Sequence, residues 1–277
     1  MAVLFLFVSS LSWTLFDLAR KKLVSTESPM VLTLAFNAGT FPLYLAGYLI
    51  WETTPVTVGY WIPGLISAGI AVTTALGIFT ALKHGDFSRV IPVLALTPVI
   101  STLSAGIFLD ERLSLSQWIA MLAVIGAIVG AQGGLSHVRS KSFALMLFVS
   151  FGWGVGTVID KMALQHAGPF FHGSMQTAIV TLMLVMFYAQ SRLRIRTAGH
   201  IFKLLPALLL FFSAVVFQWL ALPDLDAGVV ETVKRSVGIV GAVIAGMLVF
   251  KEHVSRAQIF WCLVILSGIP VILQPEI

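Results

Sequence analysis

Ten apolar segments, each about as long as a membrane-spanning helix, occupy most of this sequence. A helix needs about 20 apolar residues to cross the hydrocarbon core of a bilayer. The connections between the segments are short, and prolines, glycines and polar residues mark the breaks. We therefore predict an all-α integral membrane protein with ten transmembrane helices, in which consecutive helices are antiparallel neighbours. The segments are 2–20, 30–51, 60–82, 88–109, 116–134, 142–164, 170–190, 203–222, 227–250 and 257–274.

The composition excludes a water-soluble protein. Of the 277 residues, 58% are hydrophobic and 10% are charged, whereas a soluble domain is about 45–50% apolar and about 25% charged. The net charge of +5 fits basic loops on one side of a membrane, so we expect no nucleic-acid partner. The sequence lacks phosphate-binding loops, His/Cys metal spacings and nucleophile elbows. We therefore expect no enzyme activity, no cofactor and no metal.

The basic residues are distributed unevenly between the two sides of the predicted membrane. Arg112 and Lys161 lie on one side, and Lys234 and Arg235 lie within a span. Because cytoplasmic loops carry an excess of Lys and Arg, we expect a multi-pass protein of the cytoplasmic membrane with both termini outside. The thirteen residues on the other, cytoplasmic side are Arg20, Lys21, Lys22, Lys83, Arg89, Arg139, Lys141, Arg192, Arg194, Arg196, Lys203, Lys251 and Arg256.

The two halves of the chain repeat each other at an offset of 140 or 141 residues. Each half contains five predicted helices, so the second copy enters the membrane from the opposite side. Such inverted repeats are typical of secondary transporters, whose substrate site lies between the repeats near the midplane. We place the repeats at 1–138 and 139–277. The matched pairs include Trp13 and Trp153, Lys21 and Lys161, and Glu111 and Glu252.

These motifs resemble the EamA-type ten-helix carriers of the drug/metabolite transporter superfamily. The likeness rests on a tryptophan eight residues before a lysine in the first helix of each half. It also rests on the helix ends Phe108–Glu111 and Val249–Glu252. The resemblance covers essentially the whole chain. It implies two pseudo-symmetric five-helix bundles that open a central cavity alternately to each side of the membrane.

A narrower resemblance lies in the ninth segment. Val233, Lys234 and Arg235, followed by Ile239 and Val240, are similar to a stretch of the triose-phosphate and nucleotide-sugar carriers of the same superfamily. In those carriers the Lys-Arg pair holds a substrate phosphate. The resemblance therefore implies that Lys234 and Arg235 bind an anionic group of the substrate.

The position of these charges within the ninth segment supports the same interpretation independently. Lys234 and Arg235 lie about 10–12 Å along a helix that starts near Ala227, at 1.5 Å per residue. Charges at that depth are costly and usually mark a substrate path. Glu231 precedes them by three and four residues and can pair with either until an anion or a proton arrives. The alternative is a structural ion pair that fixes this helix to a neighbour.

The remaining candidates are polar and aromatic side chains of other predicted helices. Asp17 is expected to relay a proton or to pair with Lys21 or Arg235. Asp160 and Lys161 are expected to form an interfacial pair, and His172 to lie at the interface. Polar residues in apolar helices contact substrate or hold helices together, and tryptophans line the cavity or anchor the interface. The members of this last set are Asn37, Gln176, Gln218, Trp13 and Trp153.

Together these observations predict a secondary active transporter for a small anionic metabolite, phosphorylated or carboxylated. It would act as an exchanger or be coupled to protons. The alternatives are an exporter of amino acids or cationic drug-like compounds, with Glu231 or Asp17 as the acidic ligand, or a lipid-headgroup flippase. The expected partners are a small-molecule substrate and the lipid bilayer, and the expected assembly is a monomer or a homodimer.

Overall fold

The computed structural model describes residues 1–84, 91–131, 141–191, 201–249 and 255–273. These residues are almost entirely helical, and their helices correspond to the ten predicted segments within a few residues. The first repeat contains α1 (Ala2–Leu23), α2 (Pro29–Trp51), η1 (Val58–Tyr60), α3 (Trp61–His84), η2 (Ile91–Leu96), α5 (Thr97–Phe108) and α6 (Leu115–Ala131). The second contains α7 (Lys141–Leu164), α8 (Pro169–Ser191), α9 (Ile201–Ala221), η4 (Leu222–Asp224), α10 (Ala227–Val249) and α11 (Arg256–Ile272).

Local sequence explains where two of the helices begin. The Ser28 hydroxyl accepts a hydrogen bond from the Val31 amide at 3.2 Å, and Pro29 occupies the first turn of α2. The fourth predicted segment is divided, with the 3-10 helix η2 leading into α5. Pro98 stands in the first turn of α5, where a residue without an amide hydrogen is tolerated.

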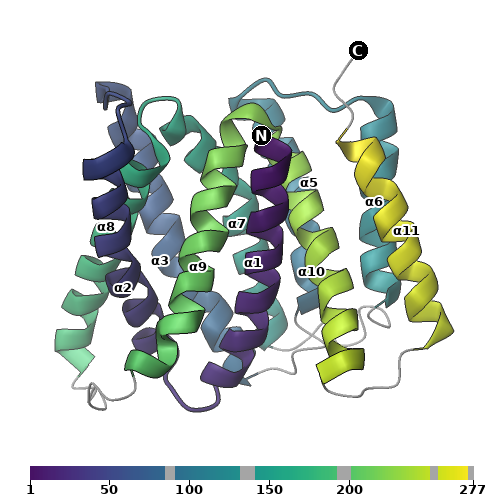
Figure 1. The fold of residues 1–277 in the computed structure, drawn as a ribbon, viewed down its shortest axis with the longest axis horizontal. Helices are drawn as coiled ribbons and strands as arrows, with labels where there is room; N and C mark the ends of the chain where they lie inside the picture. Colours follow the sequence, from purple (N-terminus) through teal and green to yellow (C-terminus); the bar gives the residue numbers. More distant parts are fainter. Residues whose placement is uncertain (85–90, 132–140, 192–200, 250–254, 274–277) are drawn as a thin grey trace.

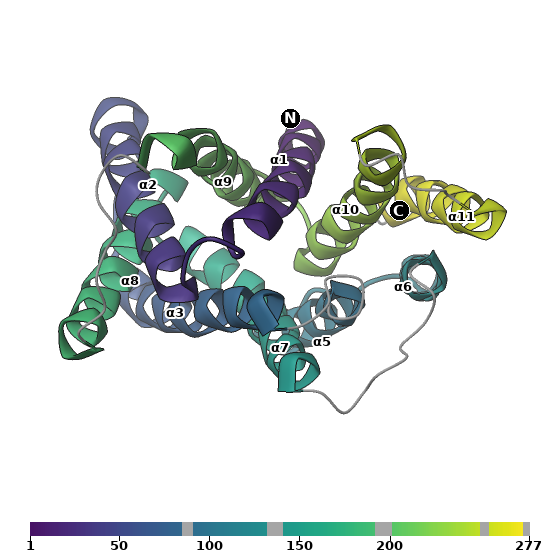
Figure 2. The same ribbon diagram turned by 90° about the horizontal axis from the view of Figure 1, so that it is seen from below.

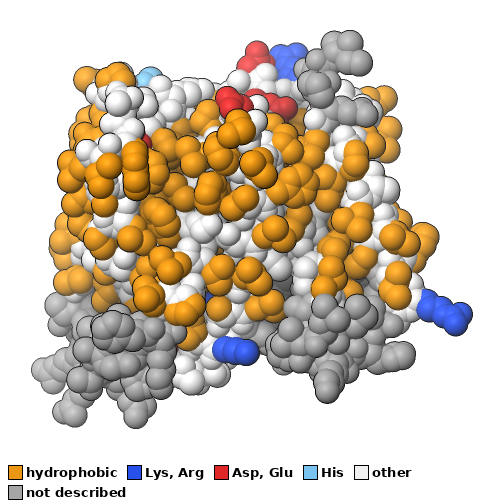
Figure 3. Space-filling model, in the orientation of Figure 1, with side chains coloured by type: hydrophobic (Ala, Val, Ile, Leu, Met, Phe, Trp, Pro, Cys, Tyr) orange, Lys and Arg blue, Asp and Glu red, His pale blue; other side chains and the backbone are white. Residues whose placement is uncertain are grey.

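The outer surface is apolar where a bilayer would contact it. Six described segments are long and apolar enough to cross a membrane, and Val93–Phe108, Leu115–Gly130 and Ile259–Ile272 are shorter apolar helices. Large side chains such as Phe151 and Leu263 are each 61% exposed. Figure 3 shows a broad hydrophobic band with charged side chains near its edges. The protein is therefore a multi-pass membrane protein.

The helices pack as two inverted five-helix repeats that interlock. In each repeat the first helix packs against the third and fourth helices of the other, so α1 contacts α9 and α10 while α7 contacts α3 and α5. The second helices, α2 and α8, pack together, as do α5 with α10 and α6 with α11. Figures 1 and 2 show α1 between α9 and α10, and α1 begins at the end of the protein where α11 ends (Figure 1).

This arrangement corrects the expectation that consecutive helices are always neighbours. The main contacts of α1 are with helices of the other repeat, although a short connection joins it to α2. Its approach to α10 depends on Gly241, where a Cβ atom would lie 2.5 Å from Thr14 Cγ2. The crossing places the inward faces of α1, α7, α9 and α10 around one polar region.

Several sequence predictions fall outside the described residues. The boundary between the repeats lies within 132–140, so the division at 138 and 139 stays a prediction. The predicted match of Glu252 with Glu111 also falls outside, as do most of the basic connections. These include Arg89, Arg139, Arg192, Arg194, Arg196 and Lys251, and the orientation of the termini therefore stays a prediction.

Candidate functional site

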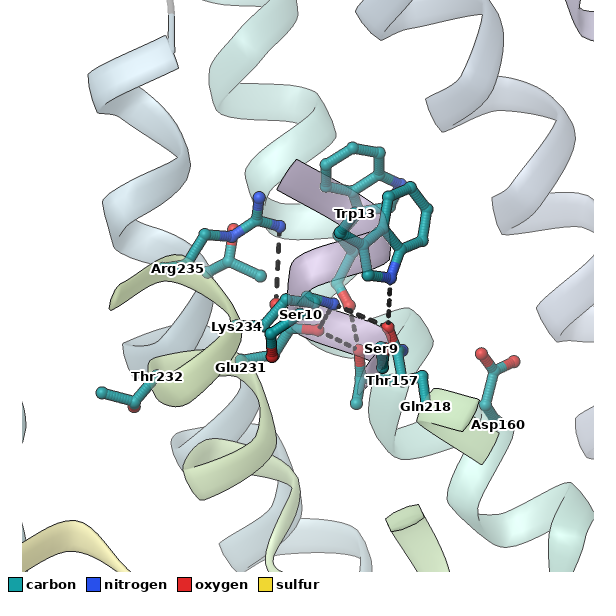
Figure 4. Close-up of polar contacts among 12 residues, drawn as sticks. Ser9, Ser10, Trp13, Thr157, Asp160, Gln218, Glu231, Thr232, Lys234 and Arg235 are labelled. Carbon is teal, nitrogen blue, oxygen red and sulfur yellow. Dashed lines mark hydrogen bonds and ion pairs between the residues drawn. The ribbon is translucent and has the colours of Figure 1, made fainter. Parts of the chain in front are cut away.

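A buried charge cluster lies on the first three turns of α10, where the sequence predicts it. Glu231 has no solvent exposure, and the side chains of Lys234 and Arg235 are 8% and 13% exposed. The Lys234 ammonium donates to Glu231 Oε1, and Arg235 Nη2 lies 3.5 Å from Glu231 Oε2. The carboxylate thus holds both cations, the second at the long limit of a hydrogen bond. Figure 4 shows these side chains converging on one another.

Helices α7, α9 and α1 complete the cluster. Thr157 on α7 donates to Glu231 Oε1 at 2.8 Å. Gln218 Oε1 on α9 accepts from Lys234 Nζ at 3.0 Å and from Trp13 Nε1 on α1 at 3.0 Å. The two repeats therefore meet at this cluster, with Trp13 contributed by the first and the other residues by the second (Figure 4).

Two tryptophans lie against the cations. The Lys234 ammonium is 5.7 Å from the Trp13 ring centroid, and the Arg235 guanidinium carbon is 5.1 Å from that of Trp153. The two indole rings are 6.2 Å apart. Indole faces attract cations, so these rings help to hold the charges inside the protein. Trp13 and Trp153, which occupy equivalent positions in the two repeats, thus line the centre rather than the membrane interface.

Asp17 pairs with a residue that sequence reasoning did not consider as its partner. Its carboxylate lies 2.8 Å from Arg20 Nη2, and the Arg20 side chain is 2% exposed. Asp17 also interacts electrostatically with Arg235 and Lys234. The Lys21 side chain lies outside the described part of the chain, so its expected pairing with Asp17 stays a prediction. Arg20, which the sequence places in a cytoplasmic connection, is the partner of Asp17 in the described structure.

A second polar cluster surrounds Asp160 and corrects two expectations. Asp160 does not pair with Lys161. Its carboxylate accepts from Trp219 Nε1 at 3.0 Å and from the Ser67 hydroxyl, and it lies 3.2 Å from His172 Nε2. His172 has no solvent exposure and its Nδ1 is 3.0 Å from the Tyr60 hydroxyl, so it is buried inside the protein rather than exposed at its surface. The helix positions are as predicted, but the pairing depends on contacts between helices that a sequence does not reveal.

Lys161 instead joins the two repeats at the end of the protein where α1 begins. Its ammonium lies 2.6 Å from Glu111 Oε1 and donates to the Leu225 carbonyl at 2.8 Å. Glu111 Oε2 also accepts from the Ala227 amide at 2.9 Å and so caps α10. Glu111 belongs to the first repeat, and the two partners of its carboxylate, Lys161 and the Ala227 amide, belong to the second, so the contact joins the repeats.

Glu52 makes a similar cap beyond the end of α2. Its carboxylate accepts from the amides of Phe170 and Phe171 at 2.7 and 3.1 Å, at the start of α8. Partial burial raises the pKa of the Glu52 carboxyl above its usual value, and the two amide hydrogen bonds oppose that effect.

Two predicted site residues do not join the charge cluster of α10. Asn37 donates to the Thr33 carbonyl of its own helix at 2.8 Å. Gln176 donates to Ser67 Oγ at 2.6 Å, in the polar cluster around Asp160. Sequence reasoning missed Thr157, which is the counterpart of Asp17 at the 140-residue offset. The same offset pairs Arg20 with Asp160. The repeat was therefore the sequence signal that could have identified both Thr157 and Arg20 as site residues.

Together, the fold and the site define a multi-pass helical membrane protein of two inverted repeats around a buried charged centre. A model of the EamA-like transporter family matches residues 1–131 and 140–274. The chain belongs to that family, and it is a transporter of small molecules in a lipid bilayer. This confirms the EamA resemblance, while the narrower likeness of the ninth segment to sugar-phosphate carriers stays a prediction.

A solved structure has the same fold. It is titled only as a crystal structure of a protein and is 15% identical, with a TM-score of 0.76. The likeness covers 98% of this chain and 96% of that one, and at this identity it shows the fold alone. No curated protein sequence matches the chain.

Proposed function

We propose that this protein is a secondary active transporter of a small anionic metabolite, phosphorylated or carboxylated, across the cytoplasmic membrane. The observation that carries the proposal is the pair of buried cations, Lys234 and Arg235, that share the single carboxylate of Glu231 where the two repeats meet. Because this group of three residues has a net charge of +1, an added anion improves its electrostatic balance.

The contacts within the cluster favour Arg235 as the first group to meet the anion. Lys234 is held by both Glu231 and Gln218, whereas Arg235 reaches Glu231 only at 3.5 Å. A guanidinium presents a planar fork of donors that suits a carboxylate or phosphate, and lysine adds a point charge. An incoming anion therefore displaces Glu231 from Arg235 first and then also contacts Lys234.

Alternating access is part of this proposal, and a contact between the repeats at one end of the central region supports it. The Glu111–Lys161 contact joins the repeats at the end where α1 begins. Transport requires that this contact open in another conformation, with one repeat rocking against the other around the fixed site. The driving force is the gradient of a second anion that is exchanged for the first, or the gradient of protons that bind to Glu231.

The charge of the ligand distinguishes this proposal from export of a cation. Purified protein in detergent is screened by thermal shift with glycerol phosphate, inorganic phosphate, succinate and tetraethylammonium. The expected result is stabilisation by anions, because the cation-binding faces of Trp13 and Trp153 already contact Lys234 and Arg235. Stabilisation by tetraethylammonium alone would show that the carboxylates are the binding groups.

Transport by two variants then tests the site itself. Lys234→Ala and Arg235→Ala are each expected to reduce uptake of the stabilising anion into proteoliposomes by about 100-fold or more, since a charged contact of about 3 kcal/mol is lost. Arg112→Ala is the matched control, because that side chain is 83% exposed and pairs only with Asp110 among the described residues. Wild-type uptake by both site variants would contradict the assignment.

A further inference from the structure

Arg20 is a buried cation that the proposed mechanism does not use. It lies in the last turn of α1 and is among the largest side chains that have almost no solvent exposure. Side chains of a helix lean toward its N-terminus, so Arg20 leans along α1 toward the level of Trp13. Its guanidinium carbon lies 5.7 Å from the Phe16 ring centroid and 5.8 Å from that of Trp153.

Trp153 therefore contacts two guanidinium groups, from Arg20 on α1 and Arg235 on α10. The carbons of these groups are at most about 11 Å apart, the sum of their distances to the shared ring centroid. The two groups interact electrostatically, and Asp17 interacts with both. Like charges this close inside an apolar protein repel each other and need a shared counter-ion.

Both guanidinium groups retain unused donors. Among the described residues, Arg20 Nε and Nη2 and Arg235 Nε are buried without a hydrogen-bond partner. Asp17 lies 2.8 Å from Arg20 Nη2, but this contact lacks hydrogen-bond geometry. Leaving a buried charged donor unpaired is costly, and in native proteins such groups often mark a functional site.

The other repeat shows what a satisfied charge looks like at the equivalent position. Asp160 corresponds to Arg20 at the 140-residue offset, and it accepts hydrogen bonds from Trp219 and Ser67 and contacts His172. A purely structural charge is expected to have such a full set of partners. Arg20 does not, although it is buried at least as deeply.

We propose that Arg20 is a second anion-binding group of the same site, that Asp17 is its resident counter-ion, and that the cargo is a doubly charged small anion. This inference rests on the proposed function. Two guanidinium groups around one indole suit a dicarboxylate, whose acidic groups each take one arginine, or a phosphate monoester that reaches both. The Asp17 side chain is 25% exposed, which leaves it room to turn away when the cargo arrives.

The test compares ligands that differ by one charge. Affinities of the purified protein are measured by thermal-shift titration at pH 8 for succinate, glycerol phosphate and the monomethyl ester of each. Wild-type protein is expected to prefer the doubly charged member by about tenfold or more, the effect of one additional charge-assisted contact. Arg20→Gln is expected to bring the ratio of the affinities for the doubly and singly charged ligands close to one, with little change in the affinity for the methyl esters. Arg20→Lys is expected to restore part of that ratio.

A second variant keeps the test decisive if Arg20→Gln does not fold. Asp17→Asn removes the competing carboxylate, so it is expected to raise the affinity for the doubly charged ligands by several-fold and to increase the ratio. If Arg20→Gln leaves the ratio of the two affinities unchanged, this inference is overturned and the proposed function stays intact. If Arg20→Gln does not fold, an unchanged ratio in Asp17→Asn has the same meaning. Failure of the wild-type protein to bind any of the four anions would overturn both.

Discussion

Replacing Glu231 with glutamine tests whether the charges of α10 form one coupled unit. Glu231 is fully buried and accepts from Thr157 at 2.8 Å, while its two oxygens also contact Lys234 and Arg235. Glutamine keeps the shape and one carbonyl acceptor, so Thr157 and Lys234 keep an acceptor. The variant therefore isolates the loss of charge from the loss of volume.

The size of the effect follows from the burial of the two cations. Removing one partner of a buried ion pair costs about 3–5 kcal/mol in soluble proteins, because it leaves an uncompensated charge. Interhelical hydrogen bonds within membranes contribute about 0.6 kcal/mol on average. We therefore expect Glu231→Gln to lower the free energy of unfolding by about 3 kcal/mol, well above the loss of a single polar contact.

The assay is reversible unfolding in mixed micelles, followed by far-UV circular dichroism. The double variant Glu231→Gln/Lys234→Met is expected to recover at least half of the loss, since it removes one of the two stranded cations. Asp110→Asn is the matched control: it also removes an acid beside an arginine, but both side chains are more than 80% exposed, and such pairs contribute about 0–1 kcal/mol. A loss below about 1 kcal/mol in Glu231→Gln, or strict additivity in the double variant, would refute the reasoning.

Three further predictions concern two polar groups outside that cluster, Glu52 and Asp160. Glu52→Ala is expected to lower stability by about 1 kcal/mol, because the amides of Phe170 and Phe171 lose their cap. Because the pKa of the Glu52 carboxyl is raised in the folded state, its contribution to stability is expected to fall as pH rises through that pKa, and Glu52→Gln should abolish this dependence in unfolding titrations. Asp160→Asn is expected to cost about 2 kcal/mol by weakening the bond from Trp219; unchanged tryptophan fluorescence and stability would contradict it.

The ten helices could be predicted because long apolar segments separated by turn residues stand out in the sequence. The charges of α10 could be predicted for the same reason, since an ionised side chain stands out against an apolar segment. The packing could not. Nothing in the sequence near α1 states that it contacts α9 and α10 of the other repeat, and therefore Gln218 could be listed as a polar residue but not assigned to Lys234.

Arg20 shows a second limit, which concerns helix faces. It stands in the run Arg20-Lys21-Lys22, and a run of basic residues at a helix end is typical of a cytoplasmic loop. Successive residues turn by about 100° around a helix, so residues two apart point to nearly opposite sides. Arg20 is buried while Lys22 is exposed. Basic residues that are adjacent in the sequence thus lie on different faces of α1, one inside the protein and one on its surface.

The two repeats share an architecture, but their chemistry differs at equivalent positions. Trp13 and Trp153 match, whereas Asp17 corresponds to Thr157 and Arg20 to Asp160. Symmetry alone would give two similar half-sites facing opposite ends of the protein. The observed differences instead gather the arginines and Lys234 around Trp13 and Trp153 and leave Asp160 in a set of satisfied contacts. The inverted repeats fit the alternating mechanism that we propose, and the proposed anion site lies where the two repeats differ most in charge.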